Sequence, residues 1–220
     1  EWGKMKVSKI EKLRDSFEQL QIDGILITNP YNRRYMTGFT GTAGVVLISN
    51  SKALFITDFR YIEQATSQCP DFEIVKHTGP IHEEVASAAK ELGITKLGFE
   101  QDTLSYASYA QYKEAVSSEL VPISGVVEKL RLIKTNSEIK ILKDAANIAD
   151  AAFEHILGYI RPGRTELDVS NELEFFMRKQ GATSSSFDII VASGHRSALP
   201  HGVASDKVIE SGDFVTLDFG

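Results

Sequence analysis

The chain has 220 residues, of which 42% are hydrophobic and 25% charged, a composition typical of a soluble globular protein with one large or two small domains. Its net charge of −6 gives no electrostatic reason to expect nucleic acid or an anionic membrane as a partner. No apolar run approaches the roughly 20 residues of a membrane span, and the single Cys69 cannot close an intrachain disulfide, so we expect a cytoplasmic protein.

The first half begins with a helix and a short strand. We take Met5 as the native start and leave residues 1–4 out of the fold. Ser8 and Glu11 form a capping box that predicts a helix to about Gln21. The apolar residues 25–27 then predict a buried strand, closed by a turn at Asn29-Pro30.

Strands and helices alternate through the rest of this half. The apolar runs 45–48 and 54–57 are close enough to predict a hairpin, so we expect a mixed sheet. Further helices are predicted at 60–68, 82–92 and 104–117, and further strands at 72–75, 96–99 and 120–123. This alternation indicates an α/β N-terminal domain, a mixed sheet flanked by helices, over residues 5–125.

Two features of this half have an ordinary structural interpretation. Gly38, Gly41 and Gly44 are spaced like a dinucleotide-binding loop, but they lead into a strand rather than a helix, which excludes that motif. The segment from Asp58 to Tyr61 places an acid, a base and a phenol at a strand end. We interpret it as a helix cap with a local ion pair, the alternative being a contribution to a neighbouring subunit's cleft.

The second half, residues 126–220, begins with two capped helices in succession. Thr135 with Glu138, and Thr165 with Asp168, form capping boxes, and Gly181 is placed to end the second helix. One apolar stripe is expected on each helix to face a core. The stripes are 139, 142, 146, 149, 153 and 156 on the first helix, and 167, 173, 176 and 177 on the second.

The last residues carry the strongest chemical signal. Two strands are predicted, at 187–192 and 214–219, with a loop carrying His201 between them. Strand periodicity places Asp218 on the face opposite Val215 and Leu217. A carboxylate inside an apolar strand is costly unless a proton, a partner or a metal compensates it, so we expect Asp218 to point toward a site.

These residues resemble a known family. The run FDIIVASGHRSALPHGVASDKVIESGDFVTLDFG, with VEKLRLIKTNSEIKILKDAANIADAAF before it, is similar to the proline-specific metallopeptidases, the prolidases and Xaa-Pro aminopeptidases of the pita-bread fold. NPYNRRYMTGFTGTAG and TDFRY resemble the creatinase-type N-terminal domain of those enzymes. The resemblance implies that residues 126–220 are the first part of an α+β pita-bread catalytic domain.

The resemblance also implies a function and a set of site residues. Such enzymes hydrolyse the bond preceding proline in dipeptides or short peptides, act with two divalent ions (Mn, Co or Zn) and form homodimers. By the motif match, Asp218 corresponds to a metal-binding aspartate and His201 to a histidine that contacts the reacting carbonyl. Phe187 and Ile190 match positions that line the pocket for the residue before proline.

The other metal ligands of the family would follow Gly220. We therefore expect these 220 residues by themselves to bind no metal pair and to be inactive, with the activity in the intact protein. Two alternatives remain open at this point. One is a creatinase-like hydrolase that cleaves without metal, which Asp218 disfavours, and the other is a non-catalytic binding or assembly module of the same fold.

Overall fold

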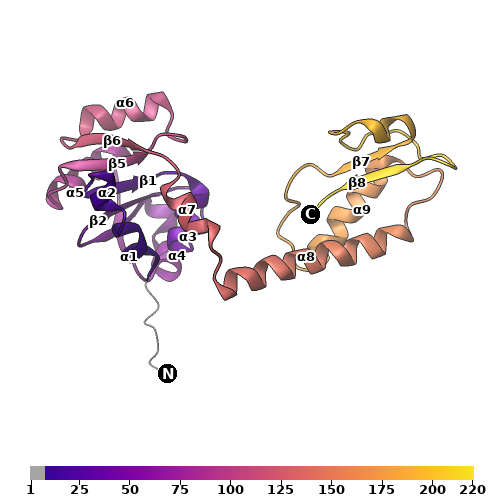
Figure 1. Ribbon diagram of the computed structural model, residues 1–220, viewed down its shortest axis with the longest axis horizontal. Coiled ribbons are helices and arrows are strands. Elements are labelled where there is room, and N and C mark those ends of the chain that lie inside the picture. The colour runs from indigo at the N-terminus through magenta and orange to yellow at the C-terminus, as the bar shows by residue number, and fades with distance from the viewer. Residues whose placement is uncertain (1–7) are drawn as a thin grey trace, which may run out of the picture. The chain divides into compact units, whose positions relative to one another are not determined.

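A computed structural model describes residues 8–220 of the chain (Figure 1), so the expected start at Met5 lies outside the described residues. The chain divides into two compact units, one ending at Ile133 and the other running from Lys134 to Gly220. Within the described range, no helix combines the length and apolar character needed to cross a membrane.

The first unit is built on a six-stranded sheet. The strands are β1 (Gly24–Ile27), β2 (Val45–Ser49), β3 (Ala53–Thr57), β4 (Glu73–Lys76), β5 (Lys96–Glu100) and β6 (Glu119–Ile123), in the order β4-β3-β2-β1-β5-β6. β2 is antiparallel to both its neighbours, and all other pairs are parallel. The predicted mixed sheet and the β2–β3 hairpin are therefore confirmed.

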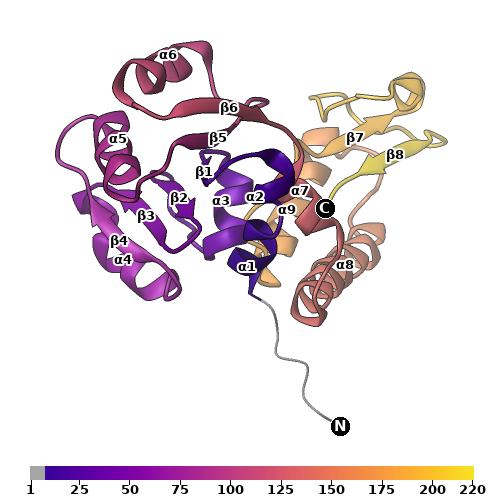
Figure 2. The ribbon, with the colours of Figure 1, turned by 60° about the vertical axis from the view of Figure 1, so that its left-hand side comes forward.

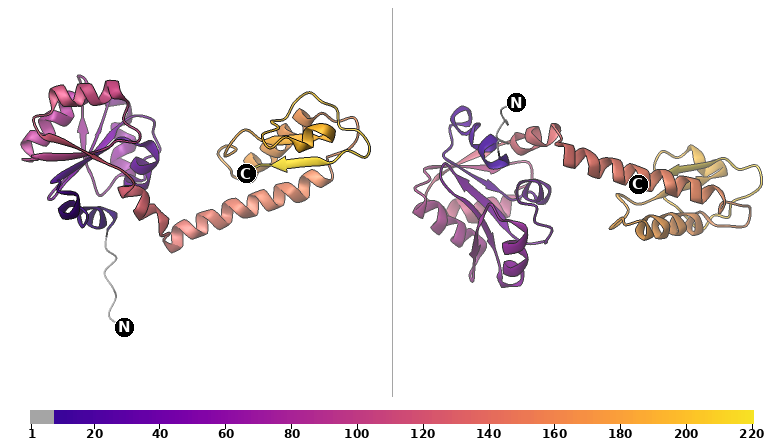
Figure 3. Two further views of the ribbon diagram at one scale, coloured as in Figure 1. Left: turned by 45° about the horizontal axis from the view of Figure 1, so that its top comes forward. Right: turned by 90° about the horizontal axis from the view of Figure 1, so that it is seen from below.

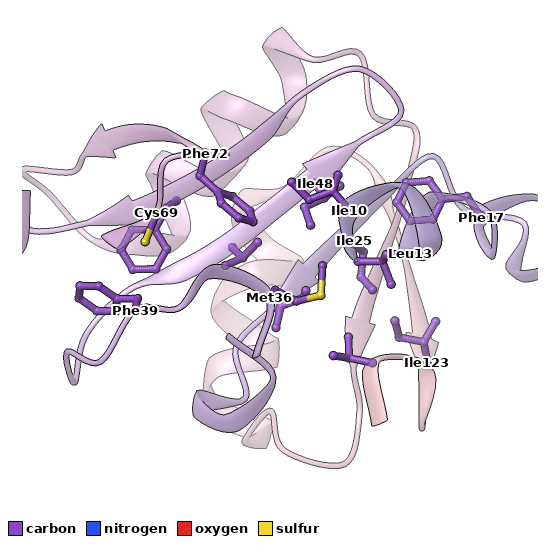
Figure 4. Close-up of a cluster of buried hydrophobic side chains, with 14 of the residues drawn as sticks. Ile10, Leu13, Phe17, Ile25, Met36, Phe39, Ile48, Cys69, Phe72 and Ile123 are labelled. Carbon is purple, nitrogen blue, oxygen red and sulfur yellow. The ribbon is translucent and has the colours of Figure 1, made fainter. Parts of the chain in front are cut away.

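Helices cover both faces of this sheet, as Figure 2 shows. One face packs against α1 (Lys9–Arg14), α2 (Phe17–Leu20), α3 (Pro30–Thr37), α4 (Ile62–Gln68) and α7 (Val126–Leu132), and the other against α5 (Ile81–Glu91) and α6 (Tyr106–Ala115). In β1, Ile25 (Figure 4) and Ile27 belong to the first core, and Leu26 belongs to the second. The central strand is thus apolar throughout because both of its faces are buried.

Local polar groups change two predicted boundaries. The helix that Ser8 caps is interrupted after Arg14, where the Ser16 hydroxyl donates to the Leu13 carbonyl oxygen at 2.6 Å. Such hydroxyl bonds compete with the helical pattern. The turn predicted at Asn29-Pro30 is wrong, because Asn29 caps α3 through the Tyr31 amide at 2.9 Å and Pro30 occupies its first position.

A buried polar network fixes the start of α3. The Asn32 side chain is fully buried, donating to Glu100 Oε1 at 2.7 Å and accepting from Arg131 at 2.9 Å. The other oxygen of Glu100 accepts from the amides of Thr28 and Asn29, both at 2.7 Å. These bonds join the ends of β1 and β5 to α3 and α7, so the charge of Glu100 is matched by donors.

The second unit joins two helices to a two-stranded antiparallel sheet, seen beside the long helix in Figure 3. Its elements are α8 (Asn136–Leu157), α9 (Glu166–Lys179), β7 (Ile190–Ser193), the 3-10 helix η2 (Gly194–Ala198) and β8 (Val215–Asp218). Both predicted capping boxes are present, and Gly181 has a φ of +108° just past α9. The core lies between the helices and one face of the sheet.

The apolar stripes of this unit are only partly buried. On α8, Ala152 and Ile156 are buried, whereas Ile139, Leu142 and Phe153 are 41–56% exposed. On α9, Leu173 and Met177 are buried, whereas Leu167 is 43% exposed and does not face inward as predicted. Among the residues of this unit that the structure describes, nothing covers the remainder of these stripes.

Candidate functional site

The two faces of the β7–β8 sheet differ in character. Val191 and Leu217 face the core formed with α8 and α9. Ile190 pairs with Asp218, and Ala192 with Thr216, on the opposite face. Directly paired residues of antiparallel strands project on the same face, so Asp218 lies beside Ile190 and away from the core, as strand periodicity predicts.

The loop carrying His201 lies over this second face. Val203 bridges to Ile190 on the side of β7 away from Asp218. A Cβ added to Gly202 would lie 2.8 Å from the Ala192 Cβ, and Thr216 donates to the Ser197 carbonyl oxygen at 3.1 Å. The loop therefore packs on the face that carries Asp218. Its residue Val203 pairs with one edge of Ile190, and Asp218 pairs with the other edge.

The side chains of the predicted site residues are open to solvent, except that of Ile190. His201 and Asp218 are exposed, and within residues 8–220 neither side chain has a hydrogen-bond or ion-pair partner. Phe187 is 46% exposed and precedes β7, next to Ser186, whose amide donates to the Gly220 carbonyl oxygen at 2.8 Å. The structure thus gathers the segments of Phe187, His201 and Asp218 around the buried Ile190.

A buried carboxylate that the sequence analysis did not single out lies beneath the loop. Glu166, at the first position of α9, is fully buried and accepts from the amides and hydroxyls of Ser193 and Ser205. Burial raises the pKa of Glu166, but the hydrogen bonds from Ser205 and Ser193 outweigh it and hold the pKa below its ordinary value. In the sequence, the capping box at Thr165 accounts for Asp168 but gives no reason to expect that Glu166 is buried.

A second ion pair extends this network. Lys207 donates to Asp213 at 2.8 Å and to the Ser193 hydroxyl at 3.0 Å. The hydrogen bond from Lys207 holds the pKa of Asp213 below its ordinary value. The Ser193 hydroxyl therefore accepts a hydrogen bond from Lys207 and donates one to Glu166 at 2.9 Å.

In the first unit, the segment from Asp58 to Tyr61 forms the helix cap and the local ion pair that the sequence predicts. The Asp58 carboxylate caps the 3-10 helix η1 (Phe59–Tyr61) through the Arg60 amide at 3.0 Å and pairs with the Arg60 guanidinium at 2.8 Å. The hydrogen bonds from Arg60 lower the pKa of Asp58 to about 2. Arg60 also lies over the Tyr61 ring, 5.3 Å from its centroid.

The described residues do not by themselves make a metal-binding site. The Asp218 carboxylate accepts no hydrogen bond from another group within residues 8–220, and carboxylate oxygens are ligands that hard divalent cations prefer. Across residues 8–220, however, no three His, Cys, Asp or Glu side chains gather in a way that could hold a metal ion. Asp218 is therefore one available donor, and this part of the chain supplies no complete set.

Comparison with known proteins decides the family. The Creatinase/Prolidase N-terminal domain matches residues 9–133, more than half of the chain, and metallopeptidase family M24 matches residues 140–220. The chain belongs to the creatinase/prolidase family of metallopeptidases. The family match confirms the resemblance carried by the sequence motifs, and with it the α/β N-terminal domain followed by the first part of the catalytic domain.

Relatives within the family are similar over nearly all of this chain. An uncharacterized peptidase of Bacillus subtilis is 62% identical over 213 residues, 96% of this chain and 60% of that protein. A structure of the Xaa-Pro dipeptidase from Bacillus anthracis is 73% identical with a TM-score of 0.94, covering 96% of this chain and 60% of that one. The prolidase from Pyrococcus horikoshii is 34% identical with a TM-score of 0.88, over 96% and 60%. The chain therefore spans about 60% of the length of these relatives.

Proposed function

We propose that the protein to which these residues belong hydrolyses the peptide bond preceding proline in dipeptides or short peptides, as a metal-dependent Xaa-Pro dipeptidase or aminopeptidase. The observation that carries the proposal is that the Asp218 carboxylate, which has no partner among the described residues, lies on the same sheet face as the His201 loop. The relatives named as Xaa-Pro dipeptidases support the reaction class. Imide bonds to proline lack an N–H and are rigid, which favours a dedicated cleft.

Each predicted site residue has one role in this proposal. Asp218 would be one ligand in a site for two divalent ions, Mn, Co or Zn, and the described residues do not supply the other donors of that site. His201 donates a hydrogen bond to the reacting carbonyl or moves a proton, a role that imidazole side chains commonly have in general acid–base catalysis. Phe187 and Ile190 line the pocket for the residue before proline, Ile190 as part of the sheet and Phe187 as an exposed side chain beside it.

The proposal also covers the assembly and the cellular location of the protein. We propose a homodimer in the cytoplasm, with no nucleic acid or membrane partner. The net charge of −6 and the single cysteine are consistent with that setting. Sedimentation of the complete gene product at micromolar concentration tests the dimer, and a monomer there would contradict it.

Release of proline from an Ala-Pro dipeptide by the complete gene product, with Mn²⁺ or Co²⁺ added, tests the activity. We expect Asp218→Asn to abolish turnover and His201→Ala to lower kcat by about 10²–10⁴-fold. Asp206→Asn, an exposed aspartate of the same unit, is the matched control and should retain full activity.

Three results would contradict the proposal in different ways. Equal turnover by Asp218→Asn would remove this carboxylate from the metal site. Full activity in the presence of a chelator would favour the creatinase-like, metal-free alternative. No turnover of any Xaa-Pro substrate by a folded, metal-loaded protein would favour a non-catalytic module.

A further inference from the structure

We propose that Glu166 is a positioning residue for His201: its buried carboxylate clamps both ends of the loop, residues 194–204, that carries the imidazole. The inference rests on the proposed function only for what His201 does. The clamping itself is a property of the fold, and the two parts have separate tests.

One carboxylate binds both stems of the loop. Glu166 Oε1 accepts from the Ser193 amide at 2.7 Å and the Ser193 hydroxyl at 2.9 Å, where β7 ends. Oε2 accepts from the Ser205 amide at 3.1 Å and the Ser205 hydroxyl at 2.6 Å, where the loop ends. The start and the end of the loop are therefore held at a separation that a single side chain sets.

Arg196 extends the clamp into the loop itself. Its Nε lies 3.1 Å from Glu166 Oε2, and its terminal nitrogen donates to the Val203 carbonyl oxygen at 2.8 Å. Val203 is the residue that bridges to Ile190, two positions after His201. The buried carboxylate is thus connected through one guanidinium to the backbone beside His201.

The clamp is anchored on a rigid element. Glu166 is the first residue of α9, whose Val169 and Leu173 are fully buried. Its own amide donates to the Lys207 carbonyl oxygen, and the next amide, of Leu167, donates to the Ser205 carbonyl oxygen, both at 3.0 Å. The helix start therefore meets the end of the loop through main-chain bonds as well.

Charge explains why a carboxylate is required here. Glu166 receives five donors, from Ser193, Ser205 and Arg196. A glutamine has one acceptor oxygen, and its NH₂ group would face these N–H donors. Removing the charge would also leave Arg196 without its acid partner in a mostly buried position, which costs more than the loss of an exposed pair.

The consequence falls on His201 because its side chain has no partner of its own in the described residues. The position of the imidazole therefore depends on the backbone that carries it. Displacements of about 1 Å at a reacting group can cost about 10²-fold in rate. Loosening the stems should accordingly act on catalysis through His201, without contact between Glu166 and substrate.

Hydrogen exchange tests the clamp without reference to activity. In the complete gene product we expect Glu166→Gln to increase amide exchange in residues 194–205 at least tenfold, with exchange in α8 and the first unit unchanged. Glu174→Gln, a partly exposed glutamate on the same helix, is the matched control and should leave the loop protected. Unchanged exchange in Glu166→Gln would overturn the clamp.

Kinetics test the positioning role in two backgrounds. With Ala-Pro as substrate, Glu166→Gln should lower kcat at least tenfold with a smaller change in KM, because the substrate pocket is left in place. In a His201→Ala background the same substitution should have no further effect on kcat. An equal loss in both backgrounds would overturn positioning through His201 and indicate a general structural role.

The outcomes separate this inference from the proposed function. If the wild-type protein has no peptidase activity but Glu166→Gln loosens the loop, the clamp holds and its catalytic purpose fails. If Glu166→Gln does not fold, Ser193→Ala and Ser205→Ala each remove one donor while leaving the charge paired. Full kcat and unchanged loop exchange in both serine variants would then overturn the proposal.

Discussion

The two units bury their sheets in opposite ways. The central strands of the first unit are covered on both faces, and its core includes large, fully buried side chains such as Phe39 and Phe55. In the second unit helices cover one sheet face and only a loop covers part of the other, while α8 leaves Ile141, Phe153 and Leu157 45–67% exposed. The first unit therefore buries the apolar residues of its central strands internally, although Phe59, Leu132 and Ile133 stay exposed, whereas the long helix of the second unit presents an apolar surface suited to further packing.

The largest expected effect comes from separating the units. Residues 8–133 expressed alone should unfold cooperatively on heating, because their core is closed. Residues 134–220 alone should unfold without a sharp transition and bind a hydrophobic dye such as ANS. Circular dichroism and dye fluorescence measure both. A sharp, dye-free transition of the second piece would show that its exposed apolar residues need no partner.

Truncating one phenylalanine in each unit compares the stabilising effect of a buried ring with that of an exposed ring. Phe55→Ala should cost about 3–5 kcal/mol of unfolding free energy, because the ring is fully buried and packs 4.6 Å from that of Phe39. Phe175→Ala is the matched control, with a ring that is 59% exposed, and should change stability by no more than about 0.5 kcal/mol. Urea denaturation measures each. Similar costs at both positions would mean that Phe175 is covered in solution.

Acid should weaken the second unit through Glu166. Its pKa is lower folded than unfolded, so its stabilising contribution is complete above its ordinary pKa of 4.5 and is lost as the pH falls through the folded value. Melting temperatures between pH 7 and pH 3 should therefore fall less in Glu166→Gln than in the wild type. Identical slopes would show that the carboxylate is not stabilised by folding.

The smallest effect concerns Asp58 in the first unit. Its carboxyl group should titrate at about 2, because Arg60 donates to it, and Arg60→Gln should return the pKa toward 3.8. NMR of the side-chain carbon measures the midpoint. We expect no measurable change in melting temperature at neutral pH, since exposed pairs contribute little. A midpoint unmoved by Arg60→Gln would mean that the guanidinium is free in solution.

Sequence patterns located most elements because hydrophobic period and capping chemistry act locally. The boxes at Thr135 and Thr165, the hairpin and the outward direction of Asp218 all depend on neighbours within a few residues. The sequence pattern does not reveal the hydrogen bond of Ser16 that interrupts the first helix, or the helix that begins at Pro30, because both residues also fit more common patterns.

The clamp at Glu166 lay beyond sequence reasoning for a different reason. Its partners Ser193 and Ser205 are 27 and 39 positions away in sequence, and only the folded chain brings them to one carboxylate. The same holds for Asn32 and Glu100, 68 positions apart. Residue type and spacing identify which groups carry charge, whereas the partners that make burial of that charge tolerable are set by tertiary structure.

The close contact between Gly202 and Ala192 limits the distance between the loop that carries His201 and strand β7. Position 202 has ordinary backbone angles, so only the missing methyl group allows this approach. Even alanine at position 202 would bring its Cβ within 2.8 Å of the Ala192 Cβ, so either the loop next to His201 or the strand beneath it would have to shift. The position of His201 relative to the strand therefore depends on the glycine that follows it in the sequence.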